Sequence, residues 1–239
     1  MRVAVISDIH ANLYALEAVL ASIDEETPDA LWCLGDLVGY GPRPNECCAI
    51  VHERADVCLV GNHDLGVVGR VSLEDFAGDA YAAAIWTRDA LQDEHAEFIR
   101  SLEPSASRDD AELFHGSPLD PVWHYVLDSE AARWSFRGTT KPLVLVGHSH
   151  FALKIDDELR GGKAPDGTEL DLGDGRWLLN PGSVGQPRDG DARAAWLLLD
   201  LEKRFASFRR VAYPIERTQG EMRAVGLPEP LAARLAVGQ

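Results

Sequence analysis

The sequence of 239 residues contains little cysteine, little positive charge and no long apolar segment. Its four cysteines show no CxxC spacing, which argues against a thiolate metal site and favours reduced, mostly buried thiols. Lys and Arg number 23 against 39 Asp and Glu, and the formal net charge of -16 argues against a nonspecific nucleic-acid binder. An acidic chain can still bind divalent cations, because a bound cation reverses the local field. No segment reaches the ~20 apolar residues that a membrane-spanning helix needs, so we expect no membrane association.

The N-terminal part of the chain alternates between short apolar runs and segments of helical periodicity. The runs at residues 3–6, 30–34 and 57–59 are typical of strands buried on both faces, and helical spacing over residues 13–23 and 45–51 lies between them. This order predicts a parallel sheet with right-handed crossover connections. No charged leader precedes the first run, so the sequence indicates a cytoplasmic protein.

The remainder of the chain predicts further strands with fewer helices between them. Residues 65–102 favour helix, residues 104–110 a polar linker, residues 111–114 and 142–146 strands, and residues 129–136 a short helix. Later strand candidates without intervening helices predict an antiparallel meander, interrupted by an exposed excursion over residues 156–174. We expect one domain over residues 1–239: a parallel part (1–150), an antiparallel part that forms a second sheet (151–215) and a helical tail (216–239).

Polar side chains of a particular kind follow five of the predicted strands. They are carboxylates, imidazoles and one amide, namely Asp8, His10, Asp36, Asn62, His63, His115, His148 and His150. The carboxyl ends of parallel strands lie at one edge of a sheet, where ligands bind in the crevice outside it, so these side chains should converge. Oxygen and imidazole ligands without thiolate suit Mn, Fe, Zn, Ni or Co. Even seven of these eight side chains would exceed the needs of one tetrahedral ion, and the sequence therefore predicts two divalent metal ions.

The spaced motifs resemble the signature of the calcineurin-like metallophosphoesterases. They are Asp8-x-His10, Gly35-Asp36, Gly61-Asn62-His63-Asp64, His115 and Gly147-His148-x-His150. The segments 39–42 (GYGP) and 180–183 (NPGS) are similar to those of small bacterial and archaeal phosphodiesterase-like members. The resemblance implies an α/β fold, a four-layer α-β-β-α sandwich of two mixed sheets. It also implies the metal ligands: Asp8, His10 and His150 for one ion, Asn62, His115 and His148 for the other, and Asp36 as the bridge.

The resemblance further implies hydrolysis of a small phosphate ester, with diesters ahead of monoesters. A hydroxide held between the ions would attack phosphorus in line with the leaving oxygen. His63 would stabilise or protonate the leaving group, and Asp64 would fix the orientation of His63. Two departures are Ala11, where close relatives often have glycine, and Gly39-Tyr40 in place of the arginine-rich second motif of protein Ser/Thr phosphatases. The second departure counts against a phosphoprotein substrate.

Several alternatives stay open at this point. The same centre could serve a nucleotide or dinucleoside polyphosphate pyrophosphohydrolase, or the fold could be a scaffold without catalysis. Arg43 and Arg188 could each bind a phosphate or lie in solvent, and Asn12 is a helix N-cap first and a substrate-binding residue second. His52, His95 and His124 lie outside the motifs and favour surface or packing roles. The sequence leaves the substrate, the metal and the oligomeric state open, with a homodimer as one option.

Overall fold

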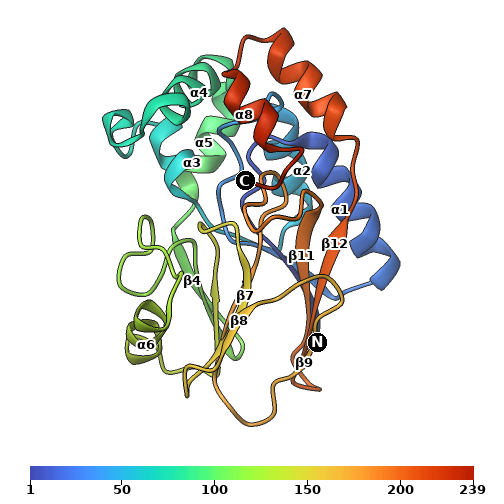
Figure 1. The fold of residues 1–239 in the computed structure, drawn as a ribbon. Coiled ribbons are helices and arrows are strands. Elements are labelled where there is room, and N and C mark those ends of the chain that lie inside the picture. Colours follow the sequence, from blue (N-terminus) through green and yellow to red (C-terminus); the bar gives the residue numbers. More distant parts are fainter.

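The computed structural model describes all 239 residues and consists of two six-stranded sheets with eight α-helices around them (Figure 1). The first sheet has the strand order β3-β2-β1-β11-β12-β9. Its strands are β1 (Arg2–Ile6), β2 (Ala30–Cys33), β3 (Val57–Cys58), β9 (Glu169–Asp171), β11 (Ala194–Asp200) and β12 (Phe205–Val211). β1 pairs in parallel with β2 and antiparallel with β11, so the sheet is mixed.

The second sheet has the strand order β4-β5-β6-β10-β7-β8. Its strands are β4 (Ser105–Arg108), β5 (Ala111–Phe114), β6 (Leu143–Val146), β7 (Ala152–Asp156), β8 (Gly161–Lys163) and β10 (Trp177–Pro181). β6 pairs in parallel with both β5 and β10, and β10 pairs antiparallel with β7. This sheet is therefore mixed as well, as the resemblance implied.

Alternate residues of the central strands contribute to different hydrophobic cores. In β1, Val3 and Val5 lie in the core between the two sheets, whereas Ala4 and Ile6 pack on the outer side against α1 (Leu13–Glu26). The outer face of the second sheet, including Val144, forms its own core with α6 (Ser129–Arg137). Because a strand alternates its side chains between faces, each sheet is buried on both sides. The predicted four-layer α-β-β-α sandwich is confirmed.

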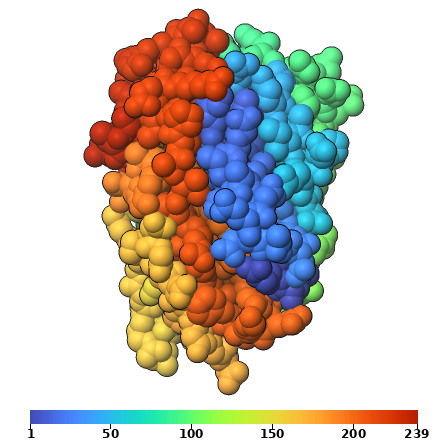
Figure 2. Space-filling model, turned by 90° about the vertical axis from the view of Figure 1, so that its right-hand side faces the viewer, coloured from blue at the N-terminus to red at the C-terminus, as the bar shows by residue number.

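Most of the helices collect at one end of the molecule. They are α2 (Pro44–Arg54), α3 (Asn62–Val67), α4 (Gly78–Ala90), α5 (Asp93–Ser101), α7 (Ile215–Ala224) and α8 (Glu229–Arg234). Figure 1 shows α3, α4, α5, α7 and α8 at the upper end, away from the N-terminus. α7 packs beside α1 at the surface (Figure 2). No helix combines the length and the apolar composition that crossing a bilayer requires.

Two predictions about the strands were wrong. The supposed polar linker at residues 104–110 contains β4, an edge strand that pairs antiparallel with β5. The region 151–215 is not a second sheet of its own, because β9, β11 and β12 belong to the first sheet and β10 runs parallel to β6. The physical reason is that β1 pairs with β2 along only one edge. β11, with its apolar side chains buried, satisfies the backbone of the other edge.

Candidate metal centre

The polar residues that follow the strands meet at the helical end of the two sheets. Asp8 and His10 come after β1, Asp36 after β2, Asn62 after β3, His115 after β5, and His148 and His150 after β6. Potential ligand atoms fall into two groups, each with all its atoms within 4.8 Å of one another. The first group is Asp8, His10, Asp36 and His150, and the second is Asp36, His115 and His148. Asp36 belongs to both groups, which is the place that the resemblance gave to a bridging ligand.

The first group is compact. Nε2 of His10 lies 3.0 Å from Nε2 of His150 and 3.6 Å from Oδ2 of Asp36. Nε2 of His150 lies 3.4 Å from Oδ1 of Asp8. The four side chains therefore direct their ligand atoms at one small space.

The second group includes the amide of Asn62. Nε2 of His115 lies 3.5 Å from Oδ2 of Asp36 and 3.3 Å from Oδ1 of Asn62. The rings of His115 and His148 lie 5.0 Å apart between centroids. Four side chains on four different segments thus surround a second space next to the first.

Three of the imidazoles are oriented through their other ring nitrogen. The Nδ1 atoms of His10, His115 and His150 lie 3.1, 2.9 and 2.6 Å from the carbonyl oxygens of Val38, Leu34 and Gln186. An Nδ1–H that donates to a carbonyl leaves the lone pair on Nε2, the nitrogen that faces the group. This is the tautomer that a metal ligand requires.

The backbone at the centre is held in an unusual conformation. Asp8, His10, Asp36, His148 and His150 all have positive φ angles, between 49° and 61°. This conformation costs roughly 1–3 kcal/mol for a residue with a side chain and persists only where the surroundings enforce it. The enforcing contacts include the N–H of His10, which donates to the carbonyl of Asp36 at 2.9 Å. Gly61 is required as well, because a β-carbon there would collide with the carboxylate of Asp36.

The charge and hydrogen bonding of the centre fit divalent cations. Asp8 Oδ1, Asp36 Oδ2 and His148 Nε2 are buried and have no hydrogen-bond partner. Burial raises the pKa of Asp8 to about 7, and burial together with nearby Asp64 raises the pKa of Asp36. Burial also lowers the pKa of His148 to about 2. Neutral imidazoles beside buried carboxylates without a counter-ion form a ligand set that a cation would complete.

His63 lies beside the first group but belongs to neither group. Its ring centroid is 5.0 Å from that of His10 and 4.4 Å from that of Tyr40, and its Nδ1 has no hydrogen-bond partner. Burial lowers the pKa of His63, so the ring is neutral at pH 7. Gly39 makes room for it, because a β-carbon there would lie 2.7 Å from Nδ1. The ring is therefore a buried neutral group next to the metal ligands.

We expected Asp64 to fix the orientation of the His63 ring, but its carboxylate forms its hydrogen bonds with other residues. Its Oδ1 accepts the N–H of Val38 and its Oδ2 accepts the N–H of Gly61, both at 3.0 Å. Asp64 is the fourth residue of the Gly-Asn-His-Asp motif and closes a capping box at the start of α3. Its carboxylate ties the loop after β2 to the loop after β3, and it positions both loops rather than the imidazole.

The structure gives the two expected substrate-binding residues other roles. Arg43 donates to Glu221 at 2.7 Å and to Glu46 at 2.9 Å, outside the two ligand groups. Asn12 caps α1 by accepting the N–H of Ala15, and its amide donates to the carbonyl of Gly185 at 2.8 Å. The polar atoms of both side chains are engaged within the protein.

Aromatic and basic side chains that the sequence did not assign to the metal ions also lie beside the centre. The ring of Tyr125 stacks on His148 at 3.9 Å between centroids, and the ring of Tyr40 meets that of His10 edge-on at 4.7 Å. Arg188 reaches the hydroxyl of Tyr40 at 3.4 Å. The sequence signals were weak: Arg188 follows the segment 180–183, Tyr40 lies in the segment 39–42, and nothing distinguished Tyr125 from a core aromatic.

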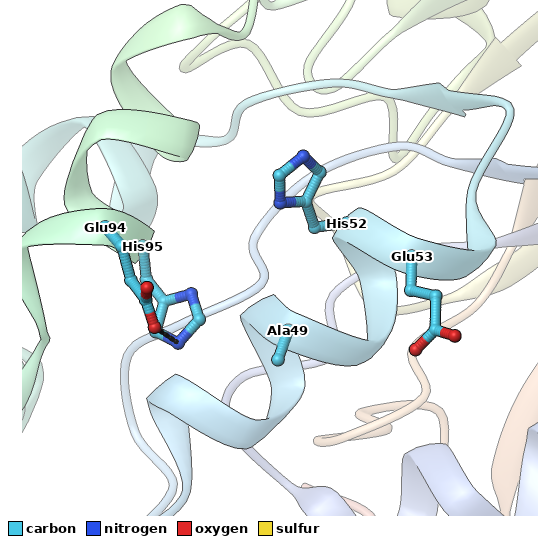
Figure 3. A pocket seen from close by; sticks show the side chains of 5 residues that line it. All are labelled: Ala49, His52, Glu53, Glu94 and His95. Carbon is cyan, nitrogen blue, oxygen red and sulfur yellow. Dashed lines mark ion pairs between the residues drawn. The ribbon is translucent and has the colours of Figure 1, made fainter.

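Two of the remaining histidines, His52 and His95, lie away from the centre, whereas the Nδ1 atom of His124 lies 2.7 Å from Oγ of Ser117. His52 and His95 line a surface groove between α2 and α5, where Figure 3 shows Glu53 pointing away from the other side chains. His95 approaches Glu94 at 3.6 Å, and His52 stacks on Phe98 at 4.2 Å between centroids. These groups do not form a convergent ligand cluster. His52 and His95 therefore have packing and surface roles.

Comparisons with known proteins agree with this geometry. A family model described as a calcineurin-like phosphoesterase superfamily domain matches residues 1–204. An uncharacterized protein of Methanocaldococcus jannaschii is 37% identical over 246 residues, with 99% of this chain and 98% of the relative covered. The crystal structure of a metallophosphoesterase from Sphaerobacter thermophilus is 43% identical, has a TM-score of 0.92 and covers 100% of this chain and 99% of its own. A hypothetical protein from Pyrococcus horikoshii shares the fold, with a TM-score of 0.82 at 21% identity, covering 100% of this chain and 98% of its own.

Proposed function

The chain belongs to the calcineurin-like phosphoesterase superfamily, and we propose that it hydrolyses small phosphate esters at a dinuclear divalent-metal centre, with diesters ahead of monoesters. The coarse activity, that of a metal-dependent phosphoesterase, follows from family membership and from the convergent Asp and His side chains. Beyond this coarse activity, we propose that two ions are bound, that the residues have the roles given below and that diesters are preferred.

One observation carries the dinuclear assignment. The carboxylate of Asp36 lies in both ligand groups, and its Oδ2 is buried without a hydrogen-bond partner at 3.6 Å from His10 and 3.5 Å from His115. A buried carboxylate oxygen placed between two sets of imidazoles has no hydrogen-bond partner in the protein itself. Two cations that share this carboxylate would stabilise it.

The chemistry divides between the ions and the chain. When bound, a pair of divalent ions supplies Lewis-acid charge and an activated water for an in-line displacement at phosphorus. The chain holds the ligands rigidly through the left-handed backbone at Asp8 and Asp36 and through the loop connections of Asp64. His63 is assigned to the leaving group, because a neutral imidazole can donate an N–H to the developing alkoxide.

The preference for diesters rests on the resemblance of the segments 39–42 and 180–183 to small phosphodiesterase-like proteins. Gly39-Tyr40 stands where the protein Ser/Thr phosphatases have an arginine-rich motif. The absence of that motif counts against a phosphoprotein, which is a monoester substrate. A scaffold without catalysis is disfavoured by the complete ligand set, since nothing in a scaffold would maintain five strained positive-φ residues around unpaired carboxylates.

The test combines metal analysis with a matched pair of substrates. Purified protein is loaded in turn with Mn, Fe, Ni, Zn or Co, and its turnover of bis(p-nitrophenyl) phosphate is compared with that of p-nitrophenyl phosphate. We expect about two ions per chain and faster turnover of the diester. His52→Ala, in the groove between α2 and α5, is the control and should match the wild-type protein. Turnover of neither ester with any metal would overturn the proposed activity, and a faster monoester would overturn the diester preference alone.

A further inference from the structure

Two arginine side chains meet at the ring of Tyr40, next to the candidate metal centre. The guanidinium carbon of Arg188 lies 5.8 Å from the ring centroid and that of Arg234 lies 5.9 Å from it. The same ring lies 4.7 Å from His10 and 4.4 Å from His63. The ring of Tyr40 is thus close both to the two guanidinium groups and to the imidazoles of His10 and His63.

Neither guanidinium has an acidic partner. Both donate to the neutral Oε1 of Gln186, Arg188 at 2.9 Å and Arg234 at 3.4 Å, and no carboxylate forms an ion pair with either. Arg188 Nε and Gln186 Nε2 are buried donors without an acceptor. Elsewhere arginines of this acidic chain do find carboxylates, as Arg210 does with Asp189. The cluster therefore has more donors than acceptors.

The two arginines come from distant segments that the fold holds together. Arg188 lies in the loop between β10 and β11, and its backbone N–H donates to the carbonyl of His150 at 3.4 Å. Arg234 is the last residue of α8, and the tail beyond it is fixed by a hydrogen bond of 3.0 Å from Gly190 N–H to the carbonyl of Gly238. Burial and then the charge of Arg188 lower the pKa of Arg234, while Tyr40 and Asp79 act in the opposite direction. An anion between the two guanidinium groups would stabilise both charges.

We propose that Arg188 and Arg234 form an anion subsite that binds a second phosphate group of the substrate while the first lies at the metal centre. The planar guanidinium group matches the oxygens of a phosphate, and two of them favour a group with more than one negative charge. The substrate class is then a phosphate ester that carries at least one further phosphate, as in an organic pyrophosphate. This inference rests on the proposed function and narrows its substrate.

The test measures binding rather than turnover. Methylphosphonate and methylenediphosphonate differ by one phosphonate group and resist hydrolysis, and their affinities for metal-loaded protein are measured by calorimetry with free metal in excess. We expect the wild-type protein to prefer the diphosphonate. Arg234→Gln and Arg188→Gln should each lower the ratio of the two affinities roughly tenfold or more, as expected for a lost charge-assisted hydrogen bond. Arg234→Lys, which keeps the charge without the planar fork, should lower it less.

A matched control comes from α7. Arg217 lies over the ring of Tyr14, with its guanidinium carbon 4.3 Å from the centroid, so Arg217→Gln removes the same charge and the same kind of contact away from the centre. It should leave the ratio as in the wild-type protein. If Arg234→Gln left the ratio of the two affinities unchanged, whether or not both affinities fell, the subsite would be overturned. A wild-type protein that hydrolyses aryl esters but binds both phosphonates equally would also overturn it and leave the proposed function standing, whereas absence of metal and of turnover would overturn that function.

Discussion

The two halves of the candidate metal centre share Asp36 but differ in charge. The first half adds a second carboxylate, Asp8, to its imidazoles, whereas the second half adds the neutral amide of Asn62. Both are buried to a similar degree, so the difference lies in the ligands and not in access to water. Since a divalent cation is attracted more strongly by two carboxylates than by one, the first half should fill at lower metal concentration. The comparison predicts that Asp36 joins two sites of unequal affinity.

Loss of the shared ligand should have the largest effect. Asp36→Asn keeps the size of the side chain but removes the charge common to both halves, so we expect fewer than one ion per chain and turnover lower by roughly 10³-fold or more. Metal analysis by mass spectrometry and aryl diester hydrolysis measure the two quantities. A variant that still bound two ions would show that Asp36 is not the bridge.

His63 belongs to neither half and should therefore separate turnover from metal binding. His63→Ala is expected to keep the wild-type metal content and to lose about 10²–10³-fold in kcat, the range for removal of one hydrogen-bond donor to a developing negative charge. The loss should shrink for substrates with a good leaving group, because less charge needs stabilisation on the leaving oxygen of such groups. An equal loss for p-nitrophenyl and alkyl esters would contradict the role at the leaving group.

Substitutions confined to one half should change one affinity. Asp8→Asn should weaken the tighter of two binding steps, and Asn62→Ala the looser one, each by roughly 10- to 100-fold or more. Titration calorimetry with Mn²⁺ resolves the two steps. If either variant weakened both steps to the same extent, the two halves would not be separate sites.

The first half should also respond more strongly to pH. In the metal-free protein the pKa of Asp8 is raised to about 7, so below pH 7 a cation must displace a proton from this carboxylate. The affinity of the first step should fall about tenfold per pH unit below 7 and level off above it. The imidazole of His148 adds no such slope there, because its pKa is lowered to about 2. Asp36, whose pKa is also raised, adds a slope that both steps share, so Asp8→Asn should make the first step no steeper than the second. An unchanged slope would assign the difference to another group.

Arg43, outside both halves, should give the smallest effect. Its ion pairs with Glu221 and Glu46 are partly exposed, so Arg43→Ala should lower the free energy of unfolding by at most about 1 kcal/mol and leave turnover within about twofold. Thermal unfolding and diester hydrolysis test this. A large loss of turnover with an unchanged melting temperature would show instead that Arg43 binds the substrate.

The ligand set could be predicted from the sequence because it obeys a local rule. Each candidate ligand lies within four residues of the end of a strand, and parallel strands end at one edge, so proximity in space follows from position in the pattern. Glycines before Asp36 and His148 marked the close approach of the backbone. These features are local in the sequence although the residues are far apart in it.

The partition of strands between the sheets could not be predicted in the same way. β10 and β11 are both apolar runs buried on two faces, and alternation reveals burial but not the neighbouring strand. β10 joins β6 and β11 joins β1 because those strands present unpaired edges. The roles of the arginines could not be predicted either. Arg43 donates to Glu221 of α7, whereas Arg188 donates to Gln186, and the sequence does not show these partners. Such choices depend on pairings between distant segments.

The central claim is that Asp36 is shared by two ions. The most direct measurement is an anomalous-scattering map from crystals of the protein grown with Mn²⁺. The account predicts two peaks, roughly 3.5–4 Å apart, that both contact the carboxylate of Asp36. A single peak, or two peaks of which only one touches Asp36, would contradict it.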